Sequence, residues 1–279
     1  MSQCHVSHVK LMDYVKFLEN KDSRTRAKQV LDALAAMELQ PAVQECRRPQ
    51  IRNIEVDFLP QSPAKRPLFS AHYDVVKGSP GANDNASGVA VLLGLCNELR
   101  KAPVPARIVF FDREELWLRT PILRLGLLGS LHYVTRVRLK NIAAVYNLEF
   151  CGSGDVLAVW PVKTQQTSLP AFREVEKAAS RLSVPLRSAH IPWMLLSSDH
   201  LSFRLRGFSN ALTLSLLPGN QIPSLECLLS ALSVKRLLTG WRPTLPEPLS
   251  FLHSDKDTSS NLNENSLRLM LALMLELTR

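Results

Sequence analysis

Cysteine is scarce in this chain of 279 residues, and the cysteines it has are widely spaced. Their number is odd and no two form a C-x-x-C pair; the set consists of Cys4, Cys46, Cys96, Cys151 and Cys227. Such a set argues against a disulfide framework and against a structural zinc site built from thiolates. It favours a reducing compartment, and we expect Cys151 to be a small buried side chain.

Long apolar runs are absent as well. No run approaches the ~18 residues that a membrane span needs. The segment Met1–His8 lacks the charged-then-apolar order of a signal peptide. We therefore expect a cytoplasmic protein that has no membrane partner.

Basic residues outnumber acidic ones but form no long run. The 34 Lys+Arg and 25 Asp+Glu give a formal net charge of +9. Because these charges are scattered, the sequence predicts a solvated basic surface and no nucleic acid partner. The oligomeric state is left open.

The chain is long and apolar enough for one large core, with 46% hydrophobic residues. It has no internal repeat and no long linker, so we expect a single domain spanning residues 1–279. Apolar residues recur at helical spacing in two stripes within residues 8–38, with Asp22 or Ser23 capping the second helix. Residues 1–50 are thus expected to form a helical segment packed on the rest.

From residue 51 the pattern changes to short apolar runs that alternate with helical stripes. The expected strands are 51–58, 67–71, 108–111, 142–145 and 211–216. The expected helices begin after Ser87 as a cap and cover 169–183, 201–206 and 264–278. Runs that are apolar on both faces predict an α/β fold with a central mixed, mostly parallel β-sheet flanked by helices on both faces.

Polar residues follow three of these strands where each one ends. His72 follows one strand, Glu114 and Glu115 follow another, and Glu149 follows a third, while Asp84 lies in a Gly-rich loop before a helix. Open α/β sheets place their sites at the carboxyl ends of strands, so these side chains are expected at one edge. Imidazole and carboxylate donors without thiolates suit zinc, and crowded carboxylates call for more than one cation.

The adjacent Glu114 and Glu115 can take two different roles at the site. Neighbouring residues after a strand point in different directions, so one can bind metal while the other moves protons. A glutamate beside a metal-activated water is a suitable general base.

The segment from His72 to Val89, HYDVVKGSPGANDNASGV, resembles the signature of the zinc peptidase family that includes double-zinc leucyl aminopeptidases. Glutamate carboxypeptidase II and glutaminyl cyclases are similar to it. The likeness covers roughly residues 65–279 in the family's order; the further matching segments are 110–115, 126–130, 147–149, 198–200 and 253–258. It implies a zinc exopeptidase-like fold.

The resemblance also implies a set of metal ligands for two zinc ions per chain. His72 and Glu149 would hold one ion, Glu115 and His253 the other, and Asp84 would bridge them. The family usually has Asp where this chain has Glu149, so this ligand is longer by one methylene.

Other residues take supporting roles by the same resemblance. Glu114 would be the general base, and Asp74 would hydrogen-bond the His72 imidazole and fix its tautomer. Asp199 and His200 match a motif close to the site, on the substrate side. Residues 117–125 form an insertion that we expect at the rim.

These features together predict a metallo-aminopeptidase, a hydrolase that removes N-terminal residues from peptides with a metal-activated water and Glu114 as base. Three alternatives stay open. A carboxypeptidase would use Arg119 or Arg124 to grip a terminal carboxylate. A glutaminyl cyclase would use a single zinc, and a binding domain would keep the fold without catalysis.

Overall fold

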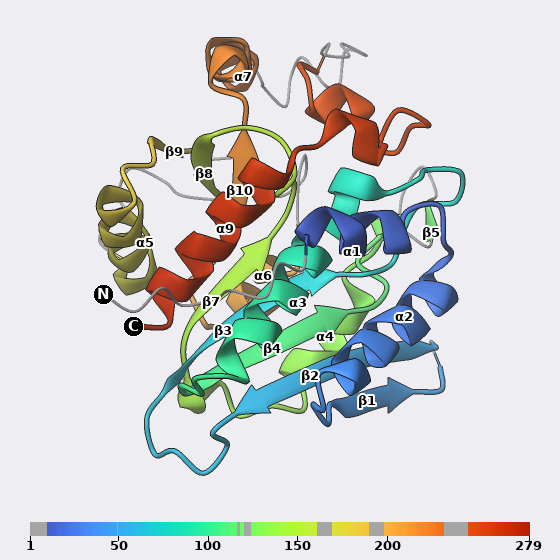
Figure 1. Ribbon diagram of the computed structural model, residues 1–279, viewed down its shortest axis with the longest axis vertical. Helices are drawn as coiled ribbons and strands as arrows, with labels where there is room; N and C mark the ends of the chain where they lie inside the picture. The colour runs from blue at the N-terminus through green and yellow to red at the C-terminus, as the bar shows by residue number, and fades with distance from the viewer. Residues whose placement is uncertain are drawn as a thin grey trace.

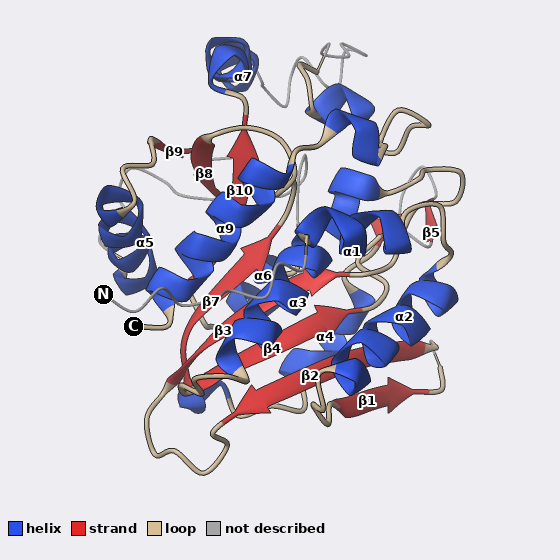
Figure 2. Cartoon of the chain, in the orientation of Figure 1, coloured by secondary structure: helices blue, strands red, loops and turns tan. Residues whose placement is uncertain are grey.

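One mixed β-sheet runs through the computed structural model, which describes residues 10–48, 50–115, 118–119, 124–160, 169–189, 198–231 and 245–279. In this part of the chain the sheet has eight strands in the order β1-β2-β4-β3-β7-β10-β8-β9, and β5 and β6 form a separate pair (Figures 1 and 2). The strands are β1 (Ala42–Cys46), β2 (Ile51–Phe58), β3 (Arg66–His72), β4 (Ala106–Phe111), β5 (Leu118–Arg119), β6 (Arg124–Leu125), β7 (Ile142–Leu148), β8 (Val156–Trp160), β9 (Leu186–Ser188) and β10 (Ala211–Leu217).

Helices cover both faces of this sheet. Figure 1 shows α1, α2, α3 and α9 in front of the strands, α5 beside α9 at the left, and α4 and α6 behind the strands. The α-helices are α1 (Leu11–Leu18), α2 (Ser23–Ala36), α3 (Ser87–Leu99), α4 (Leu128–Val134), α5 (Pro170–Arg181), α6 (His200–Leu205), α7 (Ile222–Ala231) and α9 (Glu264–Leu277). The shorter turns are η1 (Ala82–Ala86), η2 (Leu139–Asn141), η4 (Gly219–Gln221), η5 (Leu249–Phe251) and η6 (Ser259–Asn261).

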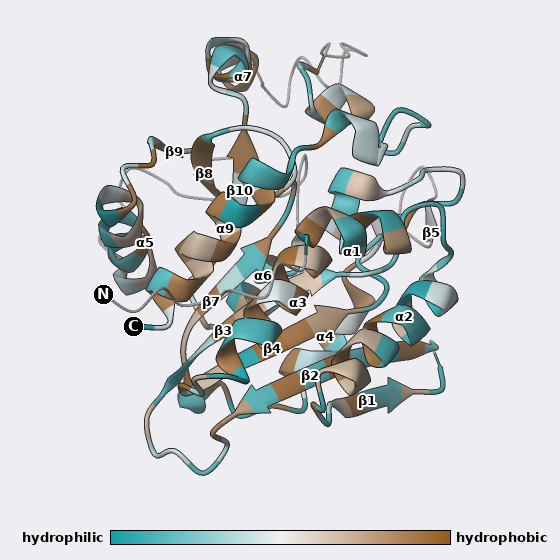
Figure 3. Ribbon diagram, viewed as in Figure 1, coloured by the Kyte–Doolittle hydropathy of each residue, from teal (hydrophilic) through white to brown (hydrophobic). Residues whose placement is uncertain are grey.

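The central strands are apolar on both faces because each face meets a helical layer (Figure 3). In β3, Phe69 and Ala71 belong to the core under α3, while Leu68 belongs to the core formed with α4 and α6. Successive strand residues point to opposite faces, so a strand between two layers must be apolar throughout. The predicted α/β class with a mixed sheet between helices is therefore confirmed. The β3–β4, β3–β7, β7–β10 and β8–β9 pairings are parallel, and β1–β2, β2–β4 and β8–β10 are antiparallel.

Two details of the predicted N-terminal half are corrected. Residues 1–50 are not helical throughout, because Ala42–Cys46 pairs with β2 as an edge strand. Ser87 is the first residue of α3 rather than its cap, and its hydroxyl donates to the Asn83 carbonyl at 2.8 Å. The cap of α2 is as expected: the Asp22 side chain accepts from the Thr25 backbone N–H.

Two further expectations, one about Cys151 and one about membrane-spanning segments, can be compared with the structure. Cys151 is fully buried, as expected. In the described residues, no helix has both the length and the apolar composition that crossing a bilayer requires.

Candidate metal centre

The polar residues that follow the central strands meet at one edge of the sheet. Strands β4, β3 and β7 are neighbours and run parallel, so their carboxyl ends lie together. His72 is the last residue of β3, Glu149 directly follows β7, and Glu114 and Glu115 come shortly after β4. This is the convergence that the sequence predicts for an open α/β sheet.

The two histidines form two sets of donor atoms that share one carboxylate. His72 Nε2 lies 3.2 Å from Asp84 Oδ1 and 3.4 Å from Glu149 Oε2. His253 Nε2 lies 3.4 Å from Asp84 Oδ2 and 3.2 Å from Glu115 Oε2. Each oxygen of Asp84 therefore belongs to a different set. The structure thus brings all five residues of the predicted ligand set together, in the predicted pairs.

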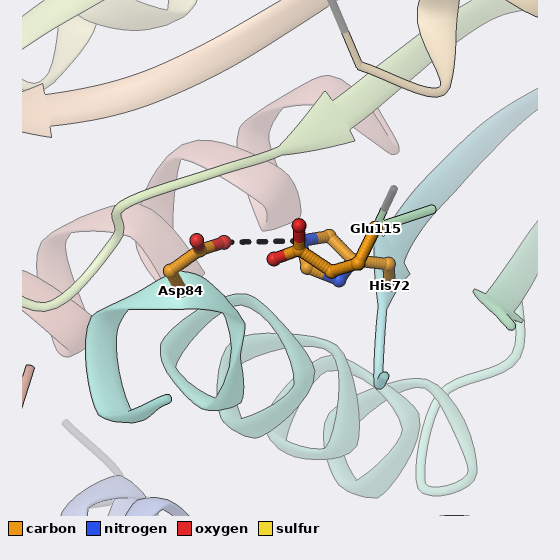
Figure 4. Close-up of side chains that lie close together, drawn as sticks. All are labelled: His72, Asp84 and Glu115. Carbon is orange, nitrogen blue, oxygen red and sulfur yellow. Dashed lines mark hydrogen bonds and ion pairs between the residues drawn. The ribbon is translucent and has the colours of Figure 1, made fainter. Parts of the chain in front are cut away.

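These separations match what a zinc ion imposes on its ligands. Zinc–nitrogen and zinc–oxygen bonds of about 2.0–2.1 Å at tetrahedral angles place neighbouring ligand atoms about 3.3 Å apart. One ligand atom from each of His72, Asp84 and Glu115 lies within 4.8 Å of the other two. Figure 4 shows these three side chains turning their polar ends toward one another. The residues present therefore fit a pair of divalent cations.

The charges of the cluster have large effects on protonation. Burial would lower the pKa of His253, but its hydrogen bonds with Asp84 and Glu115 raise it to about 10. Burial and the charge of Asp84 raise the pKa of Glu115 to about 7. For Asp84, burial is outweighed by the two histidines, which lower its pKa. The carboxylates thus favour a positive charge between them, which a proton or a metal cation can supply.

Asp74 joins the strand-end histidine to the two glutamates. Its Oδ1 lies 3.3 Å from His72 Nδ1, on the ring edge away from the cluster. The same carboxylate accepts the backbone N–H groups of Glu114 and Glu115, each at 3.1 Å. An acceptor at Nδ1 places the proton there and leaves Nε2 free for a metal. Asp74 therefore orients three site residues from behind.

The loop that presents Asp84 is fixed at both ends. Gly81 has a φ of 65°, and a Cβ there would come within 2.4 Å of the Val75 side chain, so the turn requires glycine. Asp257 accepts the backbone N–H groups of Asn83 at 2.7 Å and of Asp84 at 3.1 Å. The backbone at Asp84, which lies between the two histidines, is thus held by a second carboxylate that comes from the other end of the chain.

Glu149 reaches the cluster despite its extra methylene. Its Oε2 faces His72, while its Oε1 accepts hydrogen bonds from the Ser198 hydroxyl and from Asn147 Nδ2. Asn147 Nδ2 also contacts the Ser198 oxygen at 2.7 Å. The longer side chain is therefore held in one orientation by both neighbours.

The two residues expected on the substrate side lie in different surroundings. Asp199 is fully buried, and neither of its carboxylate oxygens has a hydrogen-bond partner among the described residues. Burial raises its pKa to about 7, and the charge of Glu149 adds to the shift, so it is close to the centre. The His200 imidazole instead bonds Thr213 Oγ1 at 2.6 Å and packs against Trp160. Burial lowers its pKa to about 3, as expected for a neutral packing residue.

Parts of the predicted rim lie outside the described residues. These parts are residues 116–117 and 120–123, together with the side chains of 118–119 and 124–125. The expected roles of Trp117, Arg119 and Arg124 belong to this segment.

A buried arginine on α2 supports the site, and the sequence interpretation missed it. Arg26 is fully buried and donates to four carbonyl oxygens. Its acceptors are the carbonyls of Leu18, Tyr73, Pro80 and Gly81, at 3.0, 3.4, 2.8 and 3.0 Å. Burial lowers its pKa to about 10, although the nearby charges of Asp74 and Asp84 oppose the shift. Arg26 therefore ties the N-terminal helices to the segment directly after His72 and to the loop that leads to Asp84.

We expect Arg26→Met to lower the free energy of unfolding by at least about 3 kcal/mol, because each buried carbonyl left without a donor costs about 1–3 kcal/mol. Urea denaturation of the metal-free protein measures this change. The control is Lys28→Met on the same helix, an exposed position where we expect a change within about 0.5 kcal/mol. A loss of under 1 kcal/mol for Arg26→Met would show that water replaces its bonds.

Two curated relatives share parts of this chain. Aminopeptidase YwaD of Bacillus subtilis (strain 168) is 42% identical over 89 residues, which are 30% of this chain and 18% of that relative. A vacuolar membrane protease of Kluyveromyces lactis is 24% identical over 213 residues, 76% of this chain and 19% of that relative. The matches therefore span less than a fifth of the length of these relatives.

Two solved structures share the fold. A zinc aminopeptidase from Bacillus subtilis superposes with a TM-score of 0.60 and 24% identity, over 81% of this chain and 49% of that chain. A glutaminyl cyclase of Porphyromonas gingivalis superposes with a TM-score of 0.69 and 17% identity, over 96% of both chains. At these identities the likeness establishes the fold alone.

A family model matches most of the chain. Residues 53–278 match peptidase family M28, a span that runs from β2 to the end of α9 and includes all five residues of the two donor sets. The resemblance noted in the sequence is thereby confirmed, and the chain belongs to peptidase family M28.

Proposed function

We propose that this protein is a two-zinc metallo-aminopeptidase that removes N-terminal residues from peptides. The observation that carries the proposal is the pair of donor sets joined by Asp84, one with His72 and Glu149 and the other with His253 and Glu115. Two sets with one shared carboxylate suit a binuclear hydrolytic site. The likeness of part of the chain to aminopeptidase YwaD supports the choice of an aminopeptidase.

The five donor residues would hold the two ions, and the protein's other groups would handle orientation and protons. Zinc in such a site supplies a more acidic water and a positive charge for the scissile carbonyl oxygen. Asp74 fixes the His72 ring, and the hydrogen bonds of Ser198 and Asn147 fix the Glu149 carboxylate. These contacts orient the donors before substrate binds.

Glu114 is the group proposed to move the proton. It follows β4 beside the donor cluster, and Asp74 accepts its backbone N–H. Burial raises its pKa well above the usual value, and the charges of Glu115 and Glu149 add to the shift. A carboxylate with a raised pKa is a stronger base, so Glu114 can take a proton from water and return it to the leaving amine.

The site opens to solvent on the side of His253. The His253 side chain is 43% exposed, whereas those of His72 and Glu149 are 1% and 5% exposed. Substrate would approach from this side, while the His72 set lies at the closed end. A closed end suits an exopeptidase, because it accommodates the end of a peptide and not a continuing chain.

Glutaminyl cyclase is the second candidate, since the Porphyromonas gingivalis enzyme matches this chain over nearly its full length. A cyclase would use a single zinc, and the second donor set of His253 and Glu115 would then have no ion to hold. We therefore rank it below the peptidase. The cytoplasmic location and the lack of a nucleic acid partner stay predictions.

The test combines metal analysis with a panel of small peptides. We expect two zinc ions per chain, hydrolysis of peptides with a free N-terminus whether or not the C-terminus is amidated, and no hydrolysis of N-acetylated peptides. Cleavage of N-acetylated but not C-amidated peptides would identify a carboxypeptidase instead. One zinc per chain with pyroglutamate formation would identify a cyclase, and a zinc-loaded protein without turnover would be a binding domain.

A further inference from the structure

A cleft of about 1120 Å³ extends from the metal centre along one side of the sheet. Its inner end is formed by Asp74 and Glu115, and the loop Val75–Lys77 forms part of its wall. Farther out it is lined by the start of α2 and by the turn that joins β1 to β2, which lie at the right of Figure 1. Among the five donor residues, Glu115 lines the cleft, so the cleft reaches the metal centre at this residue.

The outer part of this cleft holds three exposed cations that form no ion pair with a carboxylate of the described residues. Arg24, Arg47 and Lys77 line it, are exposed, and take part in no ion pair within the described part of the chain. They come from three separate segments. The fold brings the three side chains together in the lining of this cleft.

The acidic residues of the outer cleft already have ion-pair or hydrogen-bond partners within the protein. Glu45 pairs with Arg52 at 2.8 Å, and Asp112 accepts the Arg52 backbone N–H at 2.9 Å. Asp22 accepts the Thr25 backbone N–H at 2.7 Å as the cap of α2. A hydrogen bond to a backbone N–H leaves the charge of a carboxylate in place, so the sign of the outer cleft follows from its full lining. There the cations Arg24, Arg47, Arg52, Lys77 and Arg113 outnumber the carboxylates Asp22, Glu45 and Asp112, and the net positive charge suits an anionic ligand.

The position of the cleft identifies which part of a substrate would occupy it. If Glu115 holds a metal and the first residue of a peptide lies at the centre, only the chain on the carboxyl side of the scissile bond is long enough to extend outward. That segment would run past Val75–Lys77 toward the start of α2.

We propose that this cleft binds acidic side chains of peptide substrates, on the carboxyl side of the scissile bond, through Arg24, Arg47 and Lys77. The inference rests on the proposed aminopeptidase function and narrows its substrate class. Contacts between exposed charges are individually weak and screened by salt. Three together should favour an acidic over an uncharged peptide by about tenfold in kcat/KM, mainly through KM.

The test compares three peptides with the same N-terminal residue and a pair of Glu, Gln or Lys residues farther along. At low salt the wild-type zinc enzyme should prefer the Glu peptide, then the Gln peptide, then the Lys peptide, and 0.5 M NaCl should remove the preference. The triple variant Arg24→Ser, Arg47→Ser and Lys77→Ser should lose the preference while its kcat for the Gln peptide is unchanged.

The matched control is the triple variant Lys21→Ser, Lys28→Ser and Arg48→Ser, which removes three exposed cations that neighbour the cleft but do not line it. It changes net charge equally and should keep the preference. Equal rates for the three peptides in the wild type, or equal losses in both triple variants, would overturn the assignment of the cleft. Hydrolysis of none of the peptides would instead overturn the proposed function, and this inference with it.

Discussion

Replacing Glu114 by Gln is expected to lower kcat about 10²–10⁴-fold while the protein keeps two zinc ions per chain. Glutamine has nearly the same size but cannot accept a proton from water at neutral pH. The backbone N–H of residue 114 would still bond Asp74, so the neighbouring donors stay in place. Steady-state kinetics on a free N-terminal peptide and zinc analysis of the same sample measure both effects.

The adjacent glutamate gives the matched comparison. Glu115→Gln changes a carboxylate that lies 3.2 Å from His253 Nε2, so we expect this variant to lose zinc as well as activity. If both variants lost metal equally, Glu114 would be a ligand rather than the base. If Glu114→Gln kept full turnover, its proposed role would be wrong.

The stability of the metal-free Glu114→Gln protein supplies an independent check. In the folded chain, burial raises the pKa of Glu114 above its usual 4.5. The folded state then binds the proton more tightly than the unfolded state, so stability falls as pH rises above 4.5 and toward the folded-state pKa. Glutamine removes this cost, and the metal-free variant should have a Tm at pH 7 no lower than that of the metal-free wild type.

The sequence predicted the central strands of the sheet well because each apolar run in that part of the sequence forms a strand. β3, β4, β7 and β10 are buried on both faces, so each one is a short apolar run. The edge strand β1 was missed because two of its five residues are charged or amide side chains and it is largely exposed. An edge strand is defined by its partner, and its own composition carries little signal.

The convergence of the proposed ligands was predictable for a related reason. His72, Glu115 and Glu149 each stand where an apolar strand gives way to polar residues, and parallel strands bring those points together. Asp84 was expected there from its place in the Gly-rich loop, whereas its bridging role and the inclusion of His253 required the resemblance to a known family, since neither residue follows a strand of the sheet.

What the sequence did not reveal depends on contacts between distant segments. Arg26 lies in a polar stretch of α2, where a charged residue is ordinarily solvated, and only the packing of α2 on the loops near Tyr73 and Gly81 buries it. Asp257 lay within a matching segment, but its bonds to the backbone of Asn83 and Asp84 appear only in three dimensions. The cationic cleft likewise exists only where α2 meets the β1–β2 turn.

The bridging position of Asp84 leads to a graded prediction for zinc content. His253→Gln removes a donor from one set only, so we expect about one zinc per chain to remain with His72 and Glu149. Asp84→Asn removes the carboxylate common to both sets. An amide has a single, neutral oxygen donor and cannot bridge two cations, so this variant should retain less than one zinc. When a residue that only orients a metal ligand is replaced, the affinity for the metal falls about 10–100-fold. Replacing a ligand shared by two ions should therefore lower the zinc affinity by more than about 100-fold.

Metal binding should also be visible as thermal stabilisation. Zinc that binds only the folded state raises Tm in the wild type, less in His253→Gln and hardly at all in Asp84→Asn. The Asp84 loop should keep its conformation in the asparagine variant, because Asp257 bonds its backbone N–H and Gly81 sets its turn. The metal-free Tm values of the two variants therefore report any loss of fold separately from loss of metal. Retention of two zinc ions by Asp84→Asn would mean that the two donor sets bind independently, and the shared-carboxylate arrangement would have to be abandoned.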